Sequence, residues 1–279
     1  MVVPTTSSSM SRRGTPSPKE VNEIQARSMT RTKGIFGYSP NHSSGSAGLE
    51  LPVTKRVGLL GGLSWESTAR YYVLFNELSI REHGPWSQPA LIIDSLNFSQ
   101  IVRYRQAGDW VALGRVLADS ARRLESGGAT VLAIGANTMH RNYDDVAQAV
   151  SIPVLDIRDA MVSAIKARGA SAMTLLGTKS LLGHDFYSSY LERAGLQIVK
   201  PNDAEVDELQ SMIDGELAGG IVTEATRRRF IEIVSNCQSR GGEIVGLCCT
   251  EFGILVDEKS APWPYVDSVV AHVRALLDH

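Results

Sequence analysis

Short apolar runs alternate along the chain with segments whose apolar residues recur every three or four positions. The runs have the length of β-strands, and they cover residues 56–60, 90–94, 130–134, 154–157, 172–176, 196–199 and 244–247. Between them, spacings such as Tyr71, Phe75 and Leu78 are typical of one buried helix face. Strands that alternate with helices predict an α/β fold with mainly parallel sheets, in which ligands bind beyond the carboxyl ends of the strands.

The pattern occurs twice, which predicts two lobes related by a pseudo-twofold axis. Each half opens with an apolar strand and a glycine turn, and each later has a buried strand followed by a short polar segment. We expect lobe 1 at residues 55–155, with the C-terminal helix 265–279 packing back on it, and lobe 2 at 156–264. The two polar segments would then face each other, with the active site between the lobes.

Residues 1–54 differ in composition from the rest, because Ser, Thr, Pro and Gly dominate them. Such a segment buries too little apolar surface to offset the entropy of ordering, so we predict a disordered tail. Met29 is an alternative start of the chain. Arg12 and Arg13 would suit an organellar transit peptide, whereas Glu20 and Glu23 argue against one.

Composition excludes several classes of function. The 279 residues carry a formal net charge of −2, which gives no electrostatic basis for binding nucleic acid or an anionic membrane. Three cysteines, two of them adjacent, make no disulfide framework, and this favours a reduced, cytoplasmic protein. The histidines are scattered and the glycine pattern is incomplete, so we expect neither a metal site nor a dinucleotide site.

Six motifs in order carry a resemblance to a known family. They are Gly61-Gly62-Leu63-Ser64-Trp65-Glu66-Ser67-Thr68, Asn137-Thr138-Met139-His140, Leu176-Gly177-Thr178, Asp185-Phe186-Tyr187, Glu216-Leu217 and Cys249-Thr250-Glu251. Together they resemble the cofactor-independent aspartate/glutamate racemase family over residues 55–275. The resemblance implies a two-lobed enzyme, here a homodimer, that uses neither pyridoxal phosphate nor a metal. It also implies an amino acid substrate of the aspartate or glutamate type.

In the resembled family two cysteines flank the substrate α-carbon, and Cys249 matches one of them. An α-proton beside a carboxylate is a very weak acid, so its removal needs a well-placed base and stabilisation of the enolate charge. We expect donors or a helix start to lower the thiol pKa of Cys249, because a thiolate is the better base. The alternative for Cys249 is a small buried core thiol. Cys248 should point to the opposite side of the strand.

Ala136 stands where the family typically has the second cysteine, and alanine has no proton to give. Three interpretations follow. Thr138, His140 or water serves the second face of the α-carbon; the enzyme is a single-cysteine decarboxylase or isomerase of small dicarboxylic acids; or the cleft binds a ligand without turning it over. Sequence cannot distinguish a natural alanine from an engineered replacement of cysteine.

The remaining candidates are polar residues at strand ends. By the same resemblance Asn137 and Thr138 would hold the substrate carboxylate, and further contacts would come from Ser64, Ser95, Thr178, Thr250 and Glu251. Each also has a purely structural interpretation, as a helix cap or a turn residue. No arginine follows the strand ends, which leaves the binding of an acidic side chain without an obvious partner.

Overall fold

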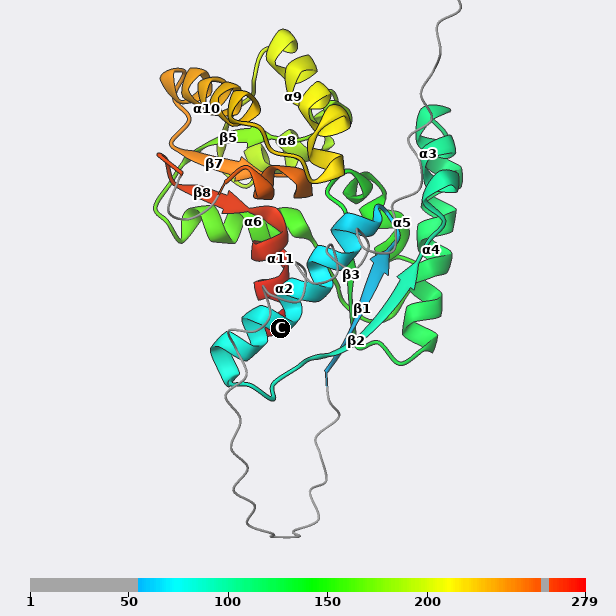
Figure 1. The fold of residues 1–279 in the computed structure, drawn as a ribbon. Coiled ribbons are helices and arrows are strands. Elements are labelled where there is room, and N and C mark those ends of the chain that lie inside the picture. The colour runs from blue at the N-terminus through cyan, green and yellow to red at the C-terminus, as the bar shows by residue number, and fades with distance from the viewer. Residues whose placement is uncertain (1–54, 257–260) are drawn as a thin grey trace, which may run out of the picture. The chain divides into compact units, whose positions relative to one another are not determined.

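The computed structural model describes residues 55–256 and 261–279. The predicted tail, residues 1–54, lies outside the described residues. Two separate four-stranded sheets organise the described chain, and each is flanked by helices (Figure 1). This confirms the predicted α/β class with two lobes of mainly parallel strands.

The first sheet holds strands β1 (Arg56–Gly61), β2 (Ala90–Ser95), β3 (Val131–Ile134) and β4 (Val154–Leu155) in the order β2-β1-β3-β4. All three pairings are parallel. In the second sheet, β5 (Ala172–Leu176), β6 (Gln197–Val199), β7 (Ile244–Leu247) and β8 (Tyr265–Asp267) are again parallel, in the order β6-β5-β7-β8. The equal strand order explains why the sequence pattern occurs twice.

Helices connect the strands in both lobes. The α-helices are α2 (Trp65–His83), α3 (Phe98–Gln106), α4 (Trp110–Ser126), α5 (Tyr143–Ala147), α6 (Ile157–Lys166), α7 (Lys179–Leu182), α8 (Asp185–Arg193), α9 (Asp203–Gly215), α10 (Glu224–Ser239) and α11 (Ser268–Asp278). Three short 3-10 helices also occur, η1 (Thr138–Asn142), η2 (Leu217–Gly219) and η3 (Thr250–Ile254). Most α-helices begin at a side-chain cap, such as Ser64 before α2 and Asn202, which forms a capping box before α9.

Alternating side chains of the central strands build a core on each face of each sheet. In β3, Val131 packs toward α2 and α11, whereas Leu132 packs toward α3 and α4. In the second lobe Cys248 belongs to the core under α6 and α8, and the next residue, Cys249, belongs to the core under α9 and α10. This alternation is the period of two that a β-strand imposes, and it confirms that the two cysteines point to opposite sides.

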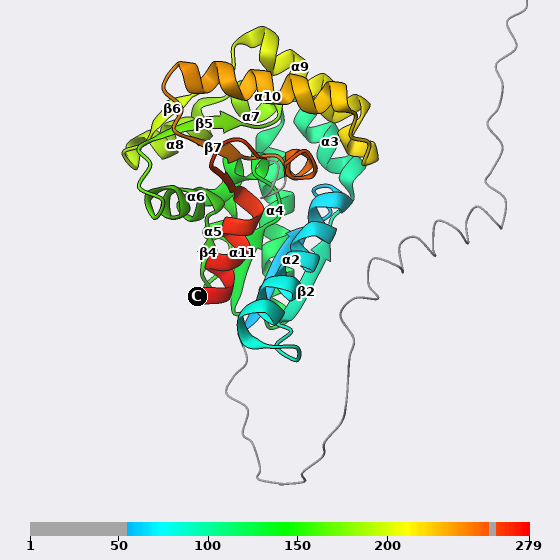
Figure 2. The same ribbon diagram turned by 60° about the vertical axis from the view of Figure 1, so that its left-hand side comes forward.

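Helix α11 follows the second sheet but packs on the first lobe. Its Val269, Val273 and Leu276 share one buried cluster with Tyr71 and Phe75 of α2, and the two helices lie side by side in both views (Figures 1 and 2). Residues 265–267, which we expected to begin the C-terminal helix, instead form strand β8 of the second sheet, and α11 begins at Ser268 because the side chain of Asp267 caps it. Residues 265–278 therefore tie the two lobes together. The proposed lobe boundary at 155/156 stays a prediction.

A glycine sets the turn between β1 and α2. Gly62 has a φ of 67°, and a Cβ there would lie 2.2 Å from the carbonyl oxygen of Leu96. Only glycine tolerates both the left-handed backbone and this close approach. The turn brings the start of α2 against the end of β3, where Ser67 Oγ donates a 2.7 Å hydrogen bond to the carbonyl oxygen of Gly135.

Candidate active site

A cavity of about 330 Å³ lies at the carboxyl ends of the central strands, and both lobes line it. From the first lobe come the start of α2, one face of α3, and the segment from Ala136 to Met139. From the second lobe come Thr178, part of α9, and the segment from Cys248 to Glu251. This is the location that the sequence predicted for the ligand, because parallel strands place their carboxyl ends at one edge of each sheet.

Ala136 and Cys249 line this same cavity. Ala136 follows β3 and packs on the core under α3 and α4, whereas Cys249 lies between β7 and η3. The cavity therefore has a methyl group contributed by one lobe and a thiol contributed by the other. Cys248 also lines the cavity, so both of its thiols come from one segment of the second lobe, and the first lobe contributes none.

Cys249 is 7% exposed, and its thiol has a carboxylate as its neighbour. Its Sγ donates a hydrogen bond of 2.9 Å to Oε2 of Glu251. Burial raises the thiol pKa well above its ordinary value, and the negative charge of Glu251 raises it further. This direction is opposite to the one expected from the sequence, so at neutral pH Cys249 rests as a thiol, which is a proton donor.

Cys248 contacts the opposite core and a tyrosine. Burial raises its thiol pKa to about 12, and the nearby hydroxyl of Tyr187 offsets part of this rise. The hydroxyl of Tyr187 donates to Oδ1 of Asn137 at 2.9 Å, and Nδ2 of Asn137 donates to Oγ of Ser268 at 2.9 Å. Both ends of the Asn137 amide are therefore held by residues of the second lobe and of α11, which fixes its orientation at the cavity wall.

Four hydroxyl residues named from the sequence also line the cavity, and they differ in their freedom. Ser64 and Thr178 accept hydrogen bonds from backbone N–H groups as the caps of α2 and α7. The hydroxyl of Thr250 donates to Glu251 Oε2 at 2.8 Å. The hydroxyl of Thr138 makes no hydrogen bond with any described residue. Thr138 is thus the hydroxyl best able to bind a ligand or a water molecule.

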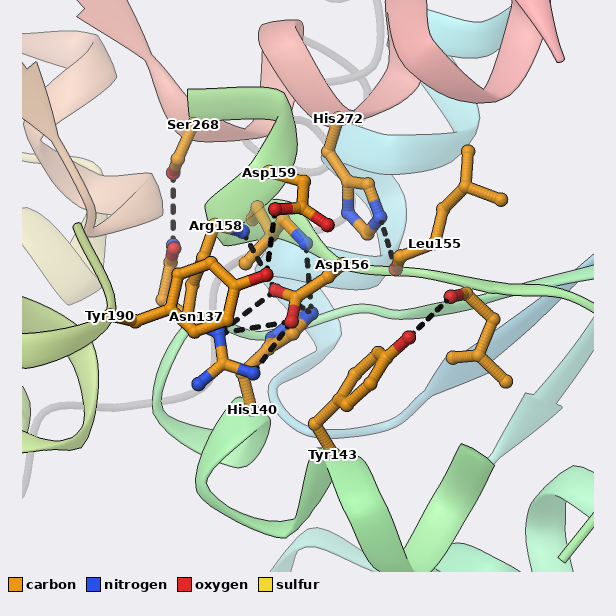
Figure 3. Close-up of polar contacts among 12 residues, drawn as sticks. Asn137, His140, Tyr143, Leu155, Asp156, Arg158, Asp159, Tyr190, Ser268 and His272 are labelled. Carbon is orange, nitrogen blue, oxygen red and sulfur yellow. Dashed lines mark hydrogen bonds and ion pairs between the residues drawn. The ribbon is translucent and has the colours of Figure 1, made fainter. Parts of the chain in front are cut away.

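His140 is not in the cavity lining. Its Nε2 accepts a 3.2 Å hydrogen bond from the N–H of Ile157, which leaves Nδ1–H to donate to the carbonyl oxygen of Ala136 at 2.9 Å. Figure 3 shows the ring among buried polar side chains near Asp156 and His272. Because both ring nitrogens are occupied and the ring lies outside the cavity lining, His140 is not placed to exchange a proton with a ligand there. It supports the backbone of Ala136 instead.

Ser95 is also outside the cavity lining. It is the last residue of β2, which is an edge strand of the first sheet, and its side chain is exposed. Its candidate contact with the distal end of a ligand has no support in the structure.

Sequence reasoning missed the helix faces that line the cavity. Phe98, Val102 and Arg105 lie on one face of α3, at positions i, i+4 and i+7, and α9 presents Gln210, Ile213 and Asp214. The i, i+4, i+7 spacing was the available signal, but it does not tell a face that lines a cavity from one that packs in a core. Arg105 has no ion-pair partner among residues 55–256 and 261–279, so it can offer a charge to an anionic ligand.

The described part of the chain shows neither a cluster of metal ligands nor a helix suited to span a membrane. No three His, Cys, Asp or Glu side chains come together there as a group able to hold a metal ion. None of its helices combines the length and the apolar content that a membrane span requires.

Comparisons with known proteins identify the family and agree with the fold. Residues 60–276 match the sequence model of the Asp/Glu/Hydantoin racemase family. The chain is 35% identical to an aspartate racemase homologue from Pyrococcus horikoshii OT3, with a TM-score of 0.74 over 81% of this chain and 98% of that structure. A candidate Asp/Glu racemase from Yersinia pestis is 32% identical, with a TM-score of 0.75 over 81% of this chain and 98% of that structure.

A curated relative is more distant. The broad specificity amino-acid racemase RacX of Bacillus subtilis (strain 168) is 24% identical over 161 residues, which is 55% of this chain. The match spans 66% of the length of that relative.

Proposed function

Because the chain belongs to the Asp/Glu/Hydantoin racemase family, we propose that it is a cofactor-independent amino-acid racemase in which Cys249 exchanges the substrate α-proton. The observation that carries the proposal is the position of Cys249, whose thiol lines the cavity between the two lobes. A small α-amino acid fits a cavity of about 330 Å³. The sulfur is then close enough to the ligand for a proton to pass to or from the α-carbon.

The residues around Cys249 provide the other requirements of the reaction. Asn137, with its amide fixed by Tyr187 and Ser268, and the free hydroxyl of Thr138 bind the substrate carboxylate and stabilise charge that develops on it. Arg105 provides a cation for a substrate carboxylate, and Glu66 provides an anion for the ammonium group. The second face of the α-carbon lies on the side of Ala136, where a water molecule held by Thr138 exchanges the proton.

The name of the Bacillus subtilis relative includes broad specificity, so the test uses a wide panel. Both enantiomers of all chiral proteinogenic amino acids are incubated in heavy water with the protein, and deuterium at the α-carbon is measured by mass spectrometry. We expect exchange with at least one amino acid and loss of that exchange in Cys249→Ala. Exchange with none of them, or a Cys249→Ala variant as active as the wild type, would refute the proposal.

A second candidate is favoured by one specific observation. The cavity has thiols on its second-lobe side alone, where Cys249 rests in its proton-donating state and the first lobe contributes the methyl group of Ala136; this suits the protonation of one face of a carbanion. A decarboxylase or isomerase of small dicarboxylic acids needs only that step. Release of carbon dioxide or a shifted double bond from a small diacid, without inversion of any amino acid, would identify it. The homodimer and the cytoplasmic location stay predictions.

A further inference from the structure

The carboxylate of Glu251 accepts two hydrogen bonds at one oxygen. Cys249 Sγ lies 2.9 Å from Oε2 of Glu251, and the hydroxyl of Thr250 lies 2.8 Å from the same atom. Both donors are at the cavity, and Glu251 itself lines it while remaining partly exposed. A proton that leaves the thiol therefore has an acceptor at hydrogen-bonding distance, and this acceptor is in contact with solvent.

The thiol needs such an acceptor. A base has to be unprotonated when the substrate is bound, but burial and the charge of Glu251 raise the pKa of Cys249 and keep it as a thiol at neutral pH. Deprotonation to bulk water would leave a buried thiolate beside a carboxylate, an arrangement of two like charges in a poorly solvated place. Moving the proton to the carboxylate keeps the number of charges at one.

We propose that Glu251 is the proton relay of Cys249, so that the carboxylate, by way of the sulfur, is the final acceptor of the substrate α-proton. This inference rests on the proposed function. It assigns to Glu251 a role that differs from holding the substrate.

The proton balance of the relay is closed. The S–H bond of Cys249 breaks and an O–H bond forms on Glu251, which leaves a thiolate and a neutral carboxylic acid. The thiolate then takes the α-proton, so the C–H bond breaks, an S–H bond forms, and the electron pair passes into the substrate carboxylate as an enediolate. The sum of both steps transfers one proton from the α-carbon to Glu251. The reverse sequence returns it, and exchange at Glu251 in between introduces a solvent proton.

Other ionisable groups around the same cavity bear on its pH dependence. They come from every element packed there, and they are Glu66 and Tyr71 of α2, Arg105 of α3, Asp214 of α9, and Cys248. Arg70 of α2 reaches the backbone carbonyl of Thr250 and pairs with Asp267. Of the described side chains, Glu251 accepts a hydrogen bond from the Cys249 thiol, and Thr250 donates one to the same acceptor oxygen.

The experiment compares the wild type with Glu251→Gln in two measurements. One is the rate of α-deuterium exchange as a function of pH, with the best substrate of the panel. The other is the rate at which iodoacetamide alkylates Cys249 at pH 8, with Cys249→Ala as the blank for the other cysteines. Glu208→Gln, which neutralises a surface carboxylate paired with Arg229, is the matched control. Thermal unfolding confirms that each variant is folded.

The relay predicts changes of opposite sign in Glu251→Gln. Removing the charge that raises the thiol pKa makes alkylation faster, whereas removing the proton acceptor lowers exchange at pH 7 at least about 100-fold. Exchange should then increase with pH up to the thiol pKa, in place of the plateau that a carboxylate acceptor gives. Formate should restore exchange to Glu251→Ala in a saturable way, because it supplies a small carboxylate to the space left by the side chain.

The two possible failures are distinguishable. If the wild type exchanges the α-proton and Glu251→Gln does so at an equal or higher rate, the relay is overturned and the proposed function stays intact. The absence of exchange in the wild type would overturn the proposed function, and the relay with it.

Discussion

Arg70 of helix α2 donates a hydrogen bond of 2.8 Å to the carbonyl oxygen of Thr250, and so joins the first lobe to the segment that carries Cys249. The same guanidinium pairs with the carboxylate of Asp267, which also caps α11 through the N–H groups of Val269 and Val270. One side chain therefore fixes the start of α2, the segment after β7 and the start of α11. The cavity depends on this junction because its walls come from separate sheets.

Arg70→Met should loosen the junction while keeping the apolar stem of the side chain. The buried carboxylate of Asp267 loses its ion-pair partner, and we expect the free energy of unfolding to fall by about 1–3 kcal/mol. Urea denaturation measures it. The control is Arg122→Met, whose ion pair with Asp119 is exposed and should contribute less than about 1 kcal/mol. Equal losses in the two variants would show that Arg70 has no special role.

Ala136→Cys should change the stereochemical outcome of the reaction. A second thiol at this position supplies a proton donor on the face where the wild type has a methyl group. We expect the ratio of inversion to α-deuterium exchange to increase at least about tenfold, a modest share of what a placed acid or base contributes. Chiral chromatography and mass spectrometry measure the two quantities. Ala136→Ser, with a far weaker acid of similar size, should show little gain.

Tyr187→Phe removes the hydroxyl that holds Oδ1 of Asn137. We expect kcat/KM to fall at least about tenfold, because the amide loses its fixed orientation toward the substrate. Stability should fall by about 1 kcal/mol. Tyr143→Phe is the matched control, since its hydroxyl donates at 2.9 Å to the carbonyl oxygen of Val154, away from the cavity lining (Figure 3). It should lose similar stability and keep its kcat/KM; a similar fall in both variants would contradict a specific effect on Asn137.

Two buried histidines should make the protein sensitive to acid. Nε2 of His272 lies 3.0 Å from the carbonyl oxygen of Leu155 (Figure 3). Its Nδ1 lies 2.8 Å from the hydroxyl of Tyr71, so the ring is neutral with its proton on Nε2. Burial lowers the pKa of His140 to about 4 and that of His272 to about 3. In the unfolded chain both titrate near pH 6.5.

Between those pH values the unfolded state binds protons that the folded state does not, so stability is complete above about pH 6.5 and is lost as the pH falls. Each histidine contributes a slope of up to about 1.4 kcal/mol per pH unit. His272→Gln should reduce the slope of the unfolding free energy between pH 6 and 4.5, as urea titrations at each pH would show. The exposed His83→Gln should not change it. An equal slope in wild type and His272→Gln would refute the assignment.

Local pattern predicted seven of the eight strands of the described chain, the repeat of the two halves and the strand ends that line the cavity, whereas the short strand β8 was taken for the start of the last helix. A buried parallel strand needs an apolar run, and the left-handed turn after β1 needs a glycine, Gly62. Both features can therefore be recognised in the sequence alone. The same alternation predicted that Cys248 and Cys249 point to opposite sides. The motif Cys249-Thr250-Glu251 indicated the chemistry.

Tertiary structure decided what surrounds those residues. His140 was a candidate acid or base until Ile157 and Ala136 proved to occupy both of its nitrogens. Arg105 lines the cavity because α3 turns one of its faces toward the cavity. The thiol pKa of Cys249 is raised because the core buries the thiol and Glu251 lies beside it. Hydrogen-bond partners and burial depend on segments far apart in the chain. A sequence determines which groups are available, whereas their protonation and access to a ligand depend on how the lobes pack.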